Sequence, residues 1–125
     1  MKIATWNVNS IRARQQRLID WLGAAQPDVL CLQELKCTDA EFPALELKTA
    51  GYHSASYGQR SYNGVAIVSK FPLVDLVRGM HDEVDEQSRV IAATAGQLRV
   101  VCAYAPNGQS VDSPAFEYKL QWYER

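Results

Sequence analysis

Two polar residues stand at the ends of strand-like segments near the start of the chain. Asn7 lies near the end of residues 2–8, which are rich in Ile, Thr, Trp and Val, and Glu34 closes the apolar run 29–32. They are 27 positions apart, close to the ~30 residues of a right-handed β-α-β unit with parallel strands. Both side chains then lie at carboxyl ends, ~5 Å apart if the strands are neighbours.

A carboxylate and an amide at one strand end can share one ion or one phosphate. An unpaired buried carboxylate is costly, so Glu34 needs a cation, a metal or hydrogen-bond donors beside it. Mg²⁺ commonly takes one or two protein carboxylates and keeps several waters. Because strand-end glutamates and turn asparagines are most often structural, the spacing alone does not assign a metal site.

The opening of the chain predicts the elements that position these residues. Apolar residues recur at helical spacing over 11–25, with Asn9 or Ser10 as cap and Pro27 just beyond. Residues 28–34 are typical of a strand covered on both faces. Residues 42–48 suit a short helix with a proline in its first turn.

The pattern then changes to successive strands. Gly or Pro separates strand-like segments at 52–57, 64–69, 73–77, 89–95 and 98–105. Strands in succession indicate antiparallel pairing, with a tight hairpin at 95–98. A helix is predicted from Ser113 and Pro114 to the end of the chain. A flavodoxin-type fold is excluded, because its strands alternate with helices.

Several strands are apolar at consecutive positions, so both faces of their sheet need cover. Two or three helices can cover one face of a sheet of about six strands, but they are too few to cover both faces. We therefore expect a second sheet from residues beyond 125. The fold class is α+β, a mixed and mainly antiparallel sheet with flanking helices. An uncovered sheet face also predicts self-association of this chain.

Composition limits the remaining classes. The 125 residues suit one domain, with 47% apolar residues and a net charge of −1. Any polyanion site must therefore be local. The sequence predicts a cytoplasmic protein that does not use a membrane. The three cysteines, 31, 37 and 102, are expected to be reduced and buried, and the acidic run 82–86 to be a solvated loop.

Four segments carry a resemblance to a known family. They read Thr-Trp-Asn-Val-Asn-Ser-Ile-Arg-Ala-Arg at 5–14, Gln-Pro-Asp-Val-Leu-Cys-Leu-Gln-Glu-Leu-Lys at 26–36, Tyr-Asn-Gly-Val-Ala at 62–66 and Tyr-Ala-Pro-Asn-Gly at 104–108. In this order they resemble the exonuclease III family, the AP endonuclease type of the endonuclease/exonuclease/phosphatase superfamily. The first two motifs together are highly specific. The resemblance covers the whole chain.

The resemblance implies the N-terminal half of a four-layer, DNase I-like α/β sandwich. Residues 1–125 are then the N-terminal portion of a single domain whose C-terminal half is absent. It also implies a Mg²⁺-dependent phosphodiesterase, with Mn²⁺ as an alternative, that acts in base-excision repair on double-stranded DNA with abasic sites or 3′ ends. Asn7 and Glu34 match the family's metal positions, and Tyr104 matches its catalytic tyrosine.

Further residues are candidates for DNA contacts at the rim of the site. Lys36 follows the metal carboxylate and is expected to pair with Glu34 or to steer phosphate. The other candidates for backbone contacts are Arg12, Arg60, Tyr62, Asn63 and Asn107. His53 and His81 do not match the family's catalytic histidine.

The family's Gly-Asp-x-Asn motif and its late Asp and His pair do not occur in these 125 residues. Loss of positioned acid-base chemistry typically costs about 10² to 10⁴ in rate. We therefore expect this chain alone to have little or no nuclease activity and to bind metal weakly. Two alternatives stay open: another phosphoesterase of the superfamily, or a non-catalytic half-domain that binds DNA or a partner through its uncovered sheet.

Overall fold

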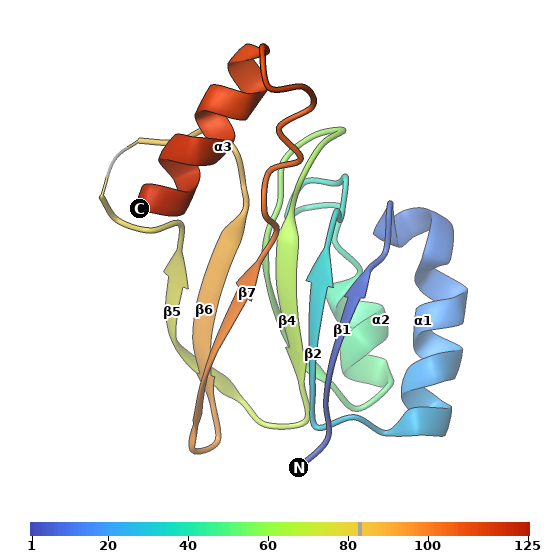
Figure 1. Cartoon of the computed structure of the whole chain (residues 1–125). Coiled ribbons are helices and arrows are strands. Elements are labelled where there is room, and N and C mark those ends of the chain that lie inside the picture. The colour runs from blue at the N-terminus through green and yellow to red at the C-terminus, as the bar shows by residue number, and fades with distance from the viewer. Residues whose placement is uncertain (83) are drawn as a thin grey trace.

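The computed structural model describes residues 1–82 and 84–125 and contains two β-sheets with helices beside them (Figure 1). In chain order the elements are β1 (Ile3–Asn7), α1 (Ile11–Ala25), β2 (Val29–Gln33), α2 (Ala44–Thr49), β3 (His53–Tyr57), β4 (Val65–Ser69), β5 (Leu73–Arg78), β6 (Val90–Ala95), β7 (Leu98–Ala103) and α3 (Pro114–Glu124). The predicted order of helices and strands is confirmed.

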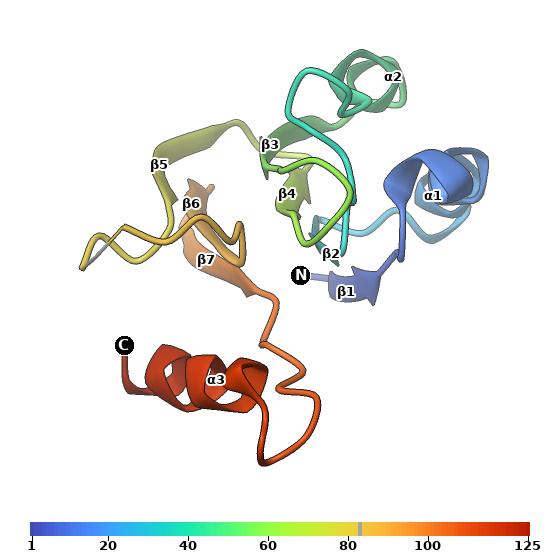
Figure 2. The ribbon, with the colours of Figure 1, turned by 90° about the horizontal axis from the view of Figure 1, so that it is seen from above.

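The first sheet has the strand order β1-β2-β4-β3, and β1 and β2 are its parallel pair. The other pairings are antiparallel. The second sheet, β5-β6-β7, is wholly antiparallel. Figure 2 shows it packed beside the first sheet, on the side away from α1 and α2. The expectation that residues beyond 125 supply the second sheet is therefore wrong, because strands β5 to β7 form one.

The β1-α1-β2 unit follows from its sequence. The side chain of Ser10 caps α1 by accepting a hydrogen bond from the backbone N–H of Ala13 at 3.3 Å. Leu18 and Leu22 lie on one face of α1 and are fully buried against the first sheet. Strand β2 is buried on both faces, by the helices on one side and by the second sheet on the other. Its carboxyl end is thereby fixed in position.

A second apolar core lies between the two sheets. Its members come from β2, β4, β6 and β7 and include Val29, Ile67, Ile91 and Cys102. The three cysteines are free thiols and buried, as predicted. None of the helices in the described part of the chain is long and apolar enough to cross a membrane.

Helix α3 is attached by polar contacts rather than by a buried apolar face. Its start at Ser113 and Pro114 is as predicted; the side chain of Ser113 caps it, and Pro114 is its first residue. At its end Arg125 pairs with Asp82 at 2.7 Å and with Asp85 at 2.8 Å. The acidic run 82–86, of which residue 83 lies outside the described residues, is therefore not simply a solvated loop. Two of its carboxylates bind the end of α3.

Candidate active site

The parallel pair brings Asn7 and Glu34 to one edge of the first sheet, as the spacing predicts. Asn7 is in register with Gln33. The backbone N–H of Ser10 donates to the carbonyl of Glu34 at 2.9 Å. Asn9, Ser10, Glu34 and Lys36 all have positive φ, between 43° and 84°. Such backbone is uncommon outside glycine and clusters at functional sites, so this edge is under unusual local constraint.

Glu34 is the centre of a polar cluster. Its Oε1 accepts a hydrogen bond from the hydroxyl of Tyr104 at 2.5 Å, and its Oε2 lies 3.7 Å from the Nζ of Lys36. The Tyr104 hydrogen bond has the largest effect on the pKa of Glu34 and lowers it. Burial opposes that effect, and a hydrogen bond with the Asn7 side chain and the Lys36 charge lower the pKa further. Glu34 is therefore an anion at neutral pH.

Tyr104 is the residue directly after strand β7. Burial and the hydrogen bond to Glu34 raise its pKa above the usual value, while the neighbouring guanidinium of Arg89 acts in the opposite direction. The phenol therefore keeps its proton at neutral pH and donates a hydrogen bond. The resemblance implies that Tyr104 is the catalytic tyrosine and that Glu34 is a metal ligand. In the structure these two side chains are in direct contact.

Lys36, in the turn that follows β2, contacts Asn9 in the turn that follows β1. Its Nζ donates to the Oδ1 of Asn9 at 2.6 Å and faces Glu34. The backbone N–H of Asn9 donates to the Oδ1 of Asn7 at 3.2 Å. Lys36 thus belongs to the centre of the cluster, and the structure gives it the pairing with Glu34 that the sequence analysis raised. Asn9 is a member of the cluster that the sequence analysis did not place among the site residues.

Of the remaining candidates, Arg12 lies in the first turn of α1, and residues 60, 62 and 63 lie in the loop between β3 and β4. This loop is at the end of the first sheet where β1 and β2 finish (Figure 1). Arg12 forms an ion pair with Glu41 at 2.6 Å, and the charge of Arg60 acts on the same carboxylate. Tyr62 is 70% exposed. Asn63 accepts a backbone hydrogen bond from Lys36 at 2.9 Å, which ties its loop to the site.

Asn107 lies three residues after Tyr104, in the segment between β7 and α3. It is exposed, and its Oδ1 accepts a hydrogen bond from the backbone N–H of Gln109 at 2.9 Å. Its backbone carbonyl lies 3.5 Å from the Nζ of Lys119. The candidates for DNA contacts therefore come from three separate segments: the first turn of α1, the loop between β3 and β4, and the segment between β7 and α3.

The oxygen donors of the site fit a hard divalent cation in part. Glu34 offers a carboxylate oxygen and Asn7 an amide oxygen, which are ligand types that Mg²⁺ and Mn²⁺ accept. Among the described residues, no group of three or more His, Cys, Asp or Glu side chains is arranged to hold a metal. Most of an octahedral shell would then come from water or from a bound phosphate.

Sequence analysis missed Arg89. It lies immediately before β6, and its guanidinium carbon is 4.8 Å from the centre of the Tyr104 ring. Its Nη1 donates to the carbonyl of Tyr104 at 3.1 Å. No motif points to this residue in a single sequence. The signal that could have found it is the strand pairing, because a hairpin between β6 and β7 places positions 89 and 104 opposite each other.

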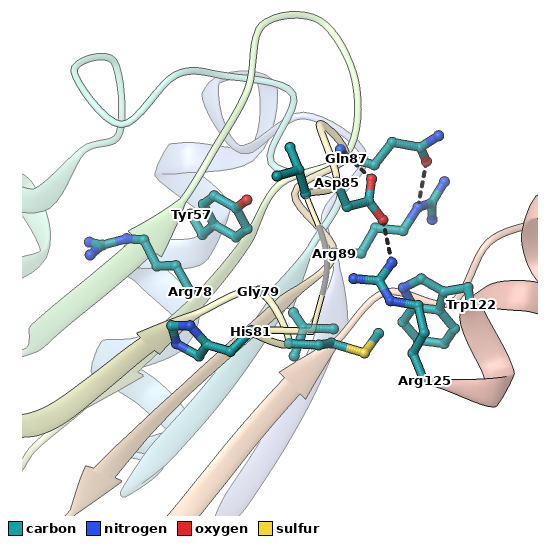
Figure 3. A pocket seen from close by; sticks show the side chains of 12 residues that line it. Tyr57, Arg78, Gly79, His81, Asp85, Gln87, Arg89, Trp122 and Arg125 are labelled. Carbon is teal, nitrogen blue, oxygen red and sulfur yellow. Dashed lines mark hydrogen bonds and ion pairs between the residues drawn. The ribbon is translucent and has the colours of Figure 1, made fainter.

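Arg89 also lines a pocket of about 230 Å³ between the end of β5 and α3 (Figure 3). Several polar side chains around this pocket are hydrogen-bonded to neighbouring groups. Gln87 accepts from the Nε of Arg89 at 2.8 Å, and its backbone N–H donates to Asp85 at 2.9 Å. Arg78 donates to the carbonyl of Ser56 at 2.8 Å. We therefore interpret the pocket walls as structural support for the neighbouring site.

Comparison with known proteins identifies relatives of the whole chain. Residues 4–125 match the model of the Endonuclease/Exonuclease/phosphatase family. Exodeoxyribonuclease III of Haemophilus influenzae is 37% identical over 115 residues, which are 88% of this chain and 43% of that protein. The DNA repair nuclease APEX1 of Danio rerio is 34% identical over 98% of this chain and 41% of that protein. The chain thus spans less than half the length of these two relatives.

Solved structures show the same fold. The 3′-5′ exonuclease NExo of Neisseria meningitidis matches 99% of this chain and 49% of its own, with 46% identity and a TM-score of 0.97. An AP endonuclease of Archaeoglobus fulgidus matches 99% of this chain and 48% of its own, with 41% identity and a TM-score of 0.96. These matches confirm the α+β fold class expected from the resemblance, the N-terminal half of a DNase I-like sandwich. This chain belongs to the Endonuclease/Exonuclease/phosphatase family, whose model it matches over residues 4–125.

Proposed function

We propose that this chain supplies the metal-binding part of a magnesium-dependent DNA phosphodiesterase of base-excision repair. Its activities are 3′-5′ exonuclease, cleavage at abasic sites and cleaning of blocked 3′ ends. The observation that carries the proposal is the meeting of Asn7, Glu34 and Tyr104 at the carboxyl end of a parallel strand pair. The likeness to exodeoxyribonuclease III and to an AP endonuclease supports it.

Each residue of the cluster has a role that its chemistry allows. Asn7 and Glu34 would hold Mg²⁺, or Mn²⁺ as an alternative, and the ion when bound supplies charge neutralisation at a phosphoryl oxygen. Tyr104 keeps its proton and donates a hydrogen bond to a phosphoryl oxygen as charge develops there. Lys36, beside Glu34, attracts the phosphate to the same edge.

The substrate we propose is double-stranded DNA with abasic sites or 3′ ends. A Neisseria relative with 46% identity has been solved with a product DNA hairpin. Lys36, Arg12, Arg60, Tyr62, Asn63 and Asn107 would contact the DNA backbone. Because the net charge is −1, this contact depends on the local rim rather than on a basic surface. We propose that the protein acts in the cytoplasm and without a membrane.

We further propose that the 125 residues alone cleave DNA slowly or not at all. The Gly-Asp-x-Asn motif and the late Asp and His pair implied by the resemblance do not occur in them. Activation of water and stabilisation of the transferring phosphoryl group therefore lack their side chains. An assay of the purified chain on an abasic-site duplex with Mg²⁺ tests this proposal, and cleavage comparable to that of a full-length relative would contradict it.

A chimera tests the proposed reaction directly. The chain is joined to the part of the Neisseria meningitidis 3′-5′ exonuclease that it does not match, since the matched parts share 46% identity. We expect the chimera to cleave duplex DNA at 3′ ends in Mg²⁺. Glu34→Gln in the chimera should lower the rate by about 10²-fold or more, because a charged metal ligand is lost.

The matched control is Glu46→Gln, because Glu46 is exposed on α2. It should leave the rate unchanged. Equal rates for Glu34→Gln and the unsubstituted chimera would exclude a metal role for Glu34. Release of phosphate from inositol phosphates without cleavage of DNA would favour another phosphoesterase of the superfamily.

Self-association is the last part of the proposal. Strands β1 and β7 lie at the ends of their sheets, and among the described strands β1 pairs with β2 alone and β7 with β6 alone. Ile3 on β1 and Val101 on β7 are 56% and 61% exposed. Unpaired strand edges with exposed apolar side chains are templates for pairing with another chain. We therefore propose that copies of this chain associate through these two edges.

A further inference from the structure

Tyr104 lies one residue beyond the end of strand β7. Strand β7 ends at Ala103, which is in register with Val90 at the start of β6. One step further, the backbone N–H of Tyr104 donates to the carbonyl of Arg89 at 2.8 Å, and the Nη1 of Arg89 donates to the carbonyl of Tyr104 at 3.1 Å. Arg89 thus binds both backbone polar groups of Tyr104 just beyond the end of the sheet ladder.

Arg89 also contacts the phenol ring of Tyr104. Its guanidinium carbon lies 4.8 Å from the ring centre of Tyr104, within the range of a cation–π contact. With the backbone held by hydrogen bonds and the ring held by this contact, the hydroxyl can reach only a limited region. In the structure that region contains the Oε1 of Glu34.

Helix α3 contacts the same guanidinium. The Tyr118 ring centre is 5.7 Å from the guanidinium carbon of Arg89. The hydroxyl of Tyr118 donates to the Oδ2 of Asp85 at 2.8 Å, and the Nη1 of Arg125 donates to that same oxygen at 2.8 Å. Figure 3 shows Arg125 pointing to Asp85, with Gln87 placed against Arg89. A continuous set of contacts therefore runs from α3 through Arg89 to Tyr104.

We propose that Arg89 is a positioning residue for Tyr104, and that the docking of Tyr118 on α3 holds Arg89 in the orientation that points the phenol at the metal-site carboxylate. The catalytic meaning of this inference rests on the proposed function, because that function gives Tyr104 its place at the reacting phosphate. The orientation of the ring can be measured without any activity.

The test uses the 125-residue chain with ¹³C-labelled tyrosine and NMR. In the unsubstituted chain, we expect the Tyr104 ring to be rigid, with a high order parameter, and to show a cross-relaxation contact with the Glu34 side chain. Arg89→Met should lower this order parameter clearly and abolish the contact with Glu34. Arg89→Lys keeps a cation for the ring and should restore part of both signals.

Two further variants separate positioning from general stability. Tyr118→Leu leaves Arg89 and Tyr104 in place, and we expect it to broaden the Nε–H signal of Arg89 and lower the order of the Tyr104 ring. Arg17→Met is the matched control, because Arg17 is exposed on α1, and it should change neither signal.

If Arg89→Met folds and the Tyr104 ring keeps both its order parameter and its contact with Glu34, the proposal is overturned. If that variant does not fold, Arg89→Lys and Tyr118→Leu decide, and an unchanged ring in both would overturn it equally. An effect of Arg89→Met without an effect of Tyr118→Leu would overturn the part assigned to α3. A failure of the proposed function appears elsewhere, as absent metal binding at Glu34 with an intact, ordered Tyr104 ring.

Discussion

Glu34 is held as an anion chiefly by one neutral neighbour. The hydrogen bond from Tyr104 lowers the pKa of Glu34 more than the charge of Lys36 does, because the ammonium lies 3.7 Å away and 37% of its side chain is exposed to water. Because the pKa of Glu34 is lower in the folded chain than its usual value of 4.5, the hydrogen bond stabilises the fold at pH values above 4.5. Its contribution is lost as the pH falls through the folded-state pKa.

The first prediction concerns this hydrogen bond. Tyr104→Phe should raise the pKa of Glu34 towards its usual value of 4.5, and Lys36→Met should raise it by less. The carboxyl carbon of Glu34, followed by NMR from pH 7 down to acid, gives both values. A larger shift in Lys36→Met than in Tyr104→Phe would show that charge rather than hydrogen bonding controls this carboxylate.

Metal binding is the second prediction at the residue scale. One carboxylate and one amide should bind a divalent ion weakly, with most of the shell left to water. Mn²⁺ added to the ¹⁵N-labelled chain should broaden the side-chain amide signal of Asn7 and the backbone signal of Glu34 first. Glu34→Gln should remove this selective broadening, whereas Glu46→Gln on α2 should keep it. Uniform broadening over the surface would contradict a site at Asn7.

At the scale of elements, local pattern was sufficient for some features and insufficient for others. The cap, the helical spacing and the apolar run over 11–34 predicted the β1-α1-β2 unit and the edge that carries Glu34. Pattern did not predict that β5 to β7 separate into a second sheet. Both layers have similar strand signals, and the split depends on which strands pair at long range. Arg89 was missed for the same reason, because its role exists only through pairing with Tyr104.

The loop between β3 and β4 gives the third prediction. A Cβ placed on Gly58 would lie 2.3 Å from the backbone carbonyl of Cys37, so alanine does not fit without a shift of the chain. We expect Gly58→Ala to lower the free energy of unfolding by about 1–3 kcal/mol. Urea denaturation measures this change. Gly23→Ala is the control, since a Cβ there meets no atom within 4 Å and should stabilise α1 slightly.

The attachment of α3 gives the fourth prediction. Burial opposes ionisation of Asp85, but hydrogen bonds from the Gln87 backbone, Tyr118 and Arg125 lower its pKa below the usual 3.8. The contact therefore stabilises α3 at and above pH 3.8, and this stabilisation is lost as the pH falls through the lower folded-state pKa. The protection of the α3 amides, relative to their intrinsic exchange rate at each pH, should fall on acidification below about pH 3.8 while α1 keeps its protection.

The same attachment can be weakened at neutral pH. Asp85→Asn should speed amide exchange in α3 about tenfold, because hydrogen bonds to a charged group contribute about 1.5–3 kcal/mol and Asp82 still pairs with Arg125. Asp20→Asn is the matched control, because Asp20 lies on α1 and accepts from Gln16 there. Unchanged exchange in α3 after Asp85→Asn would show that Asp85 does not hold this helix.

At the scale of the whole molecule, the two sheets cover each other and leave one side open. Strand β7 contacts β2 and β4, so β1 extends the first sheet past the edge of the second (Figure 2). Beside it, Ala4, Trp6, Trp21 and Leu30 line a groove of about 410 Å³. The free strand edges and the apolar groove together form an exposed apolar surface, which is typical of an interaction site. Helices α1 and α2 cover the outer face of the first sheet, whereas Val74 and Leu76 on β5 and Val101 on β7 of the second sheet are exposed.

The last prediction follows from this open side. Sedimentation of the purified chain should show association that increases with concentration, because each copy offers the free edges of β1 and β7. Ile3→Lys together with Val101→Lys places charges on both edges and should shift the chain to monomer, since a buried ammonium without a partner is costly. Leu45→Lys is the control, because Leu45 is 73% exposed on α2, away from both edges, and should leave association unchanged. A chain that stays monomeric at every concentration would show that these edges are protected without a partner, and loss of association in Leu45→Lys would move the contact to the helical face.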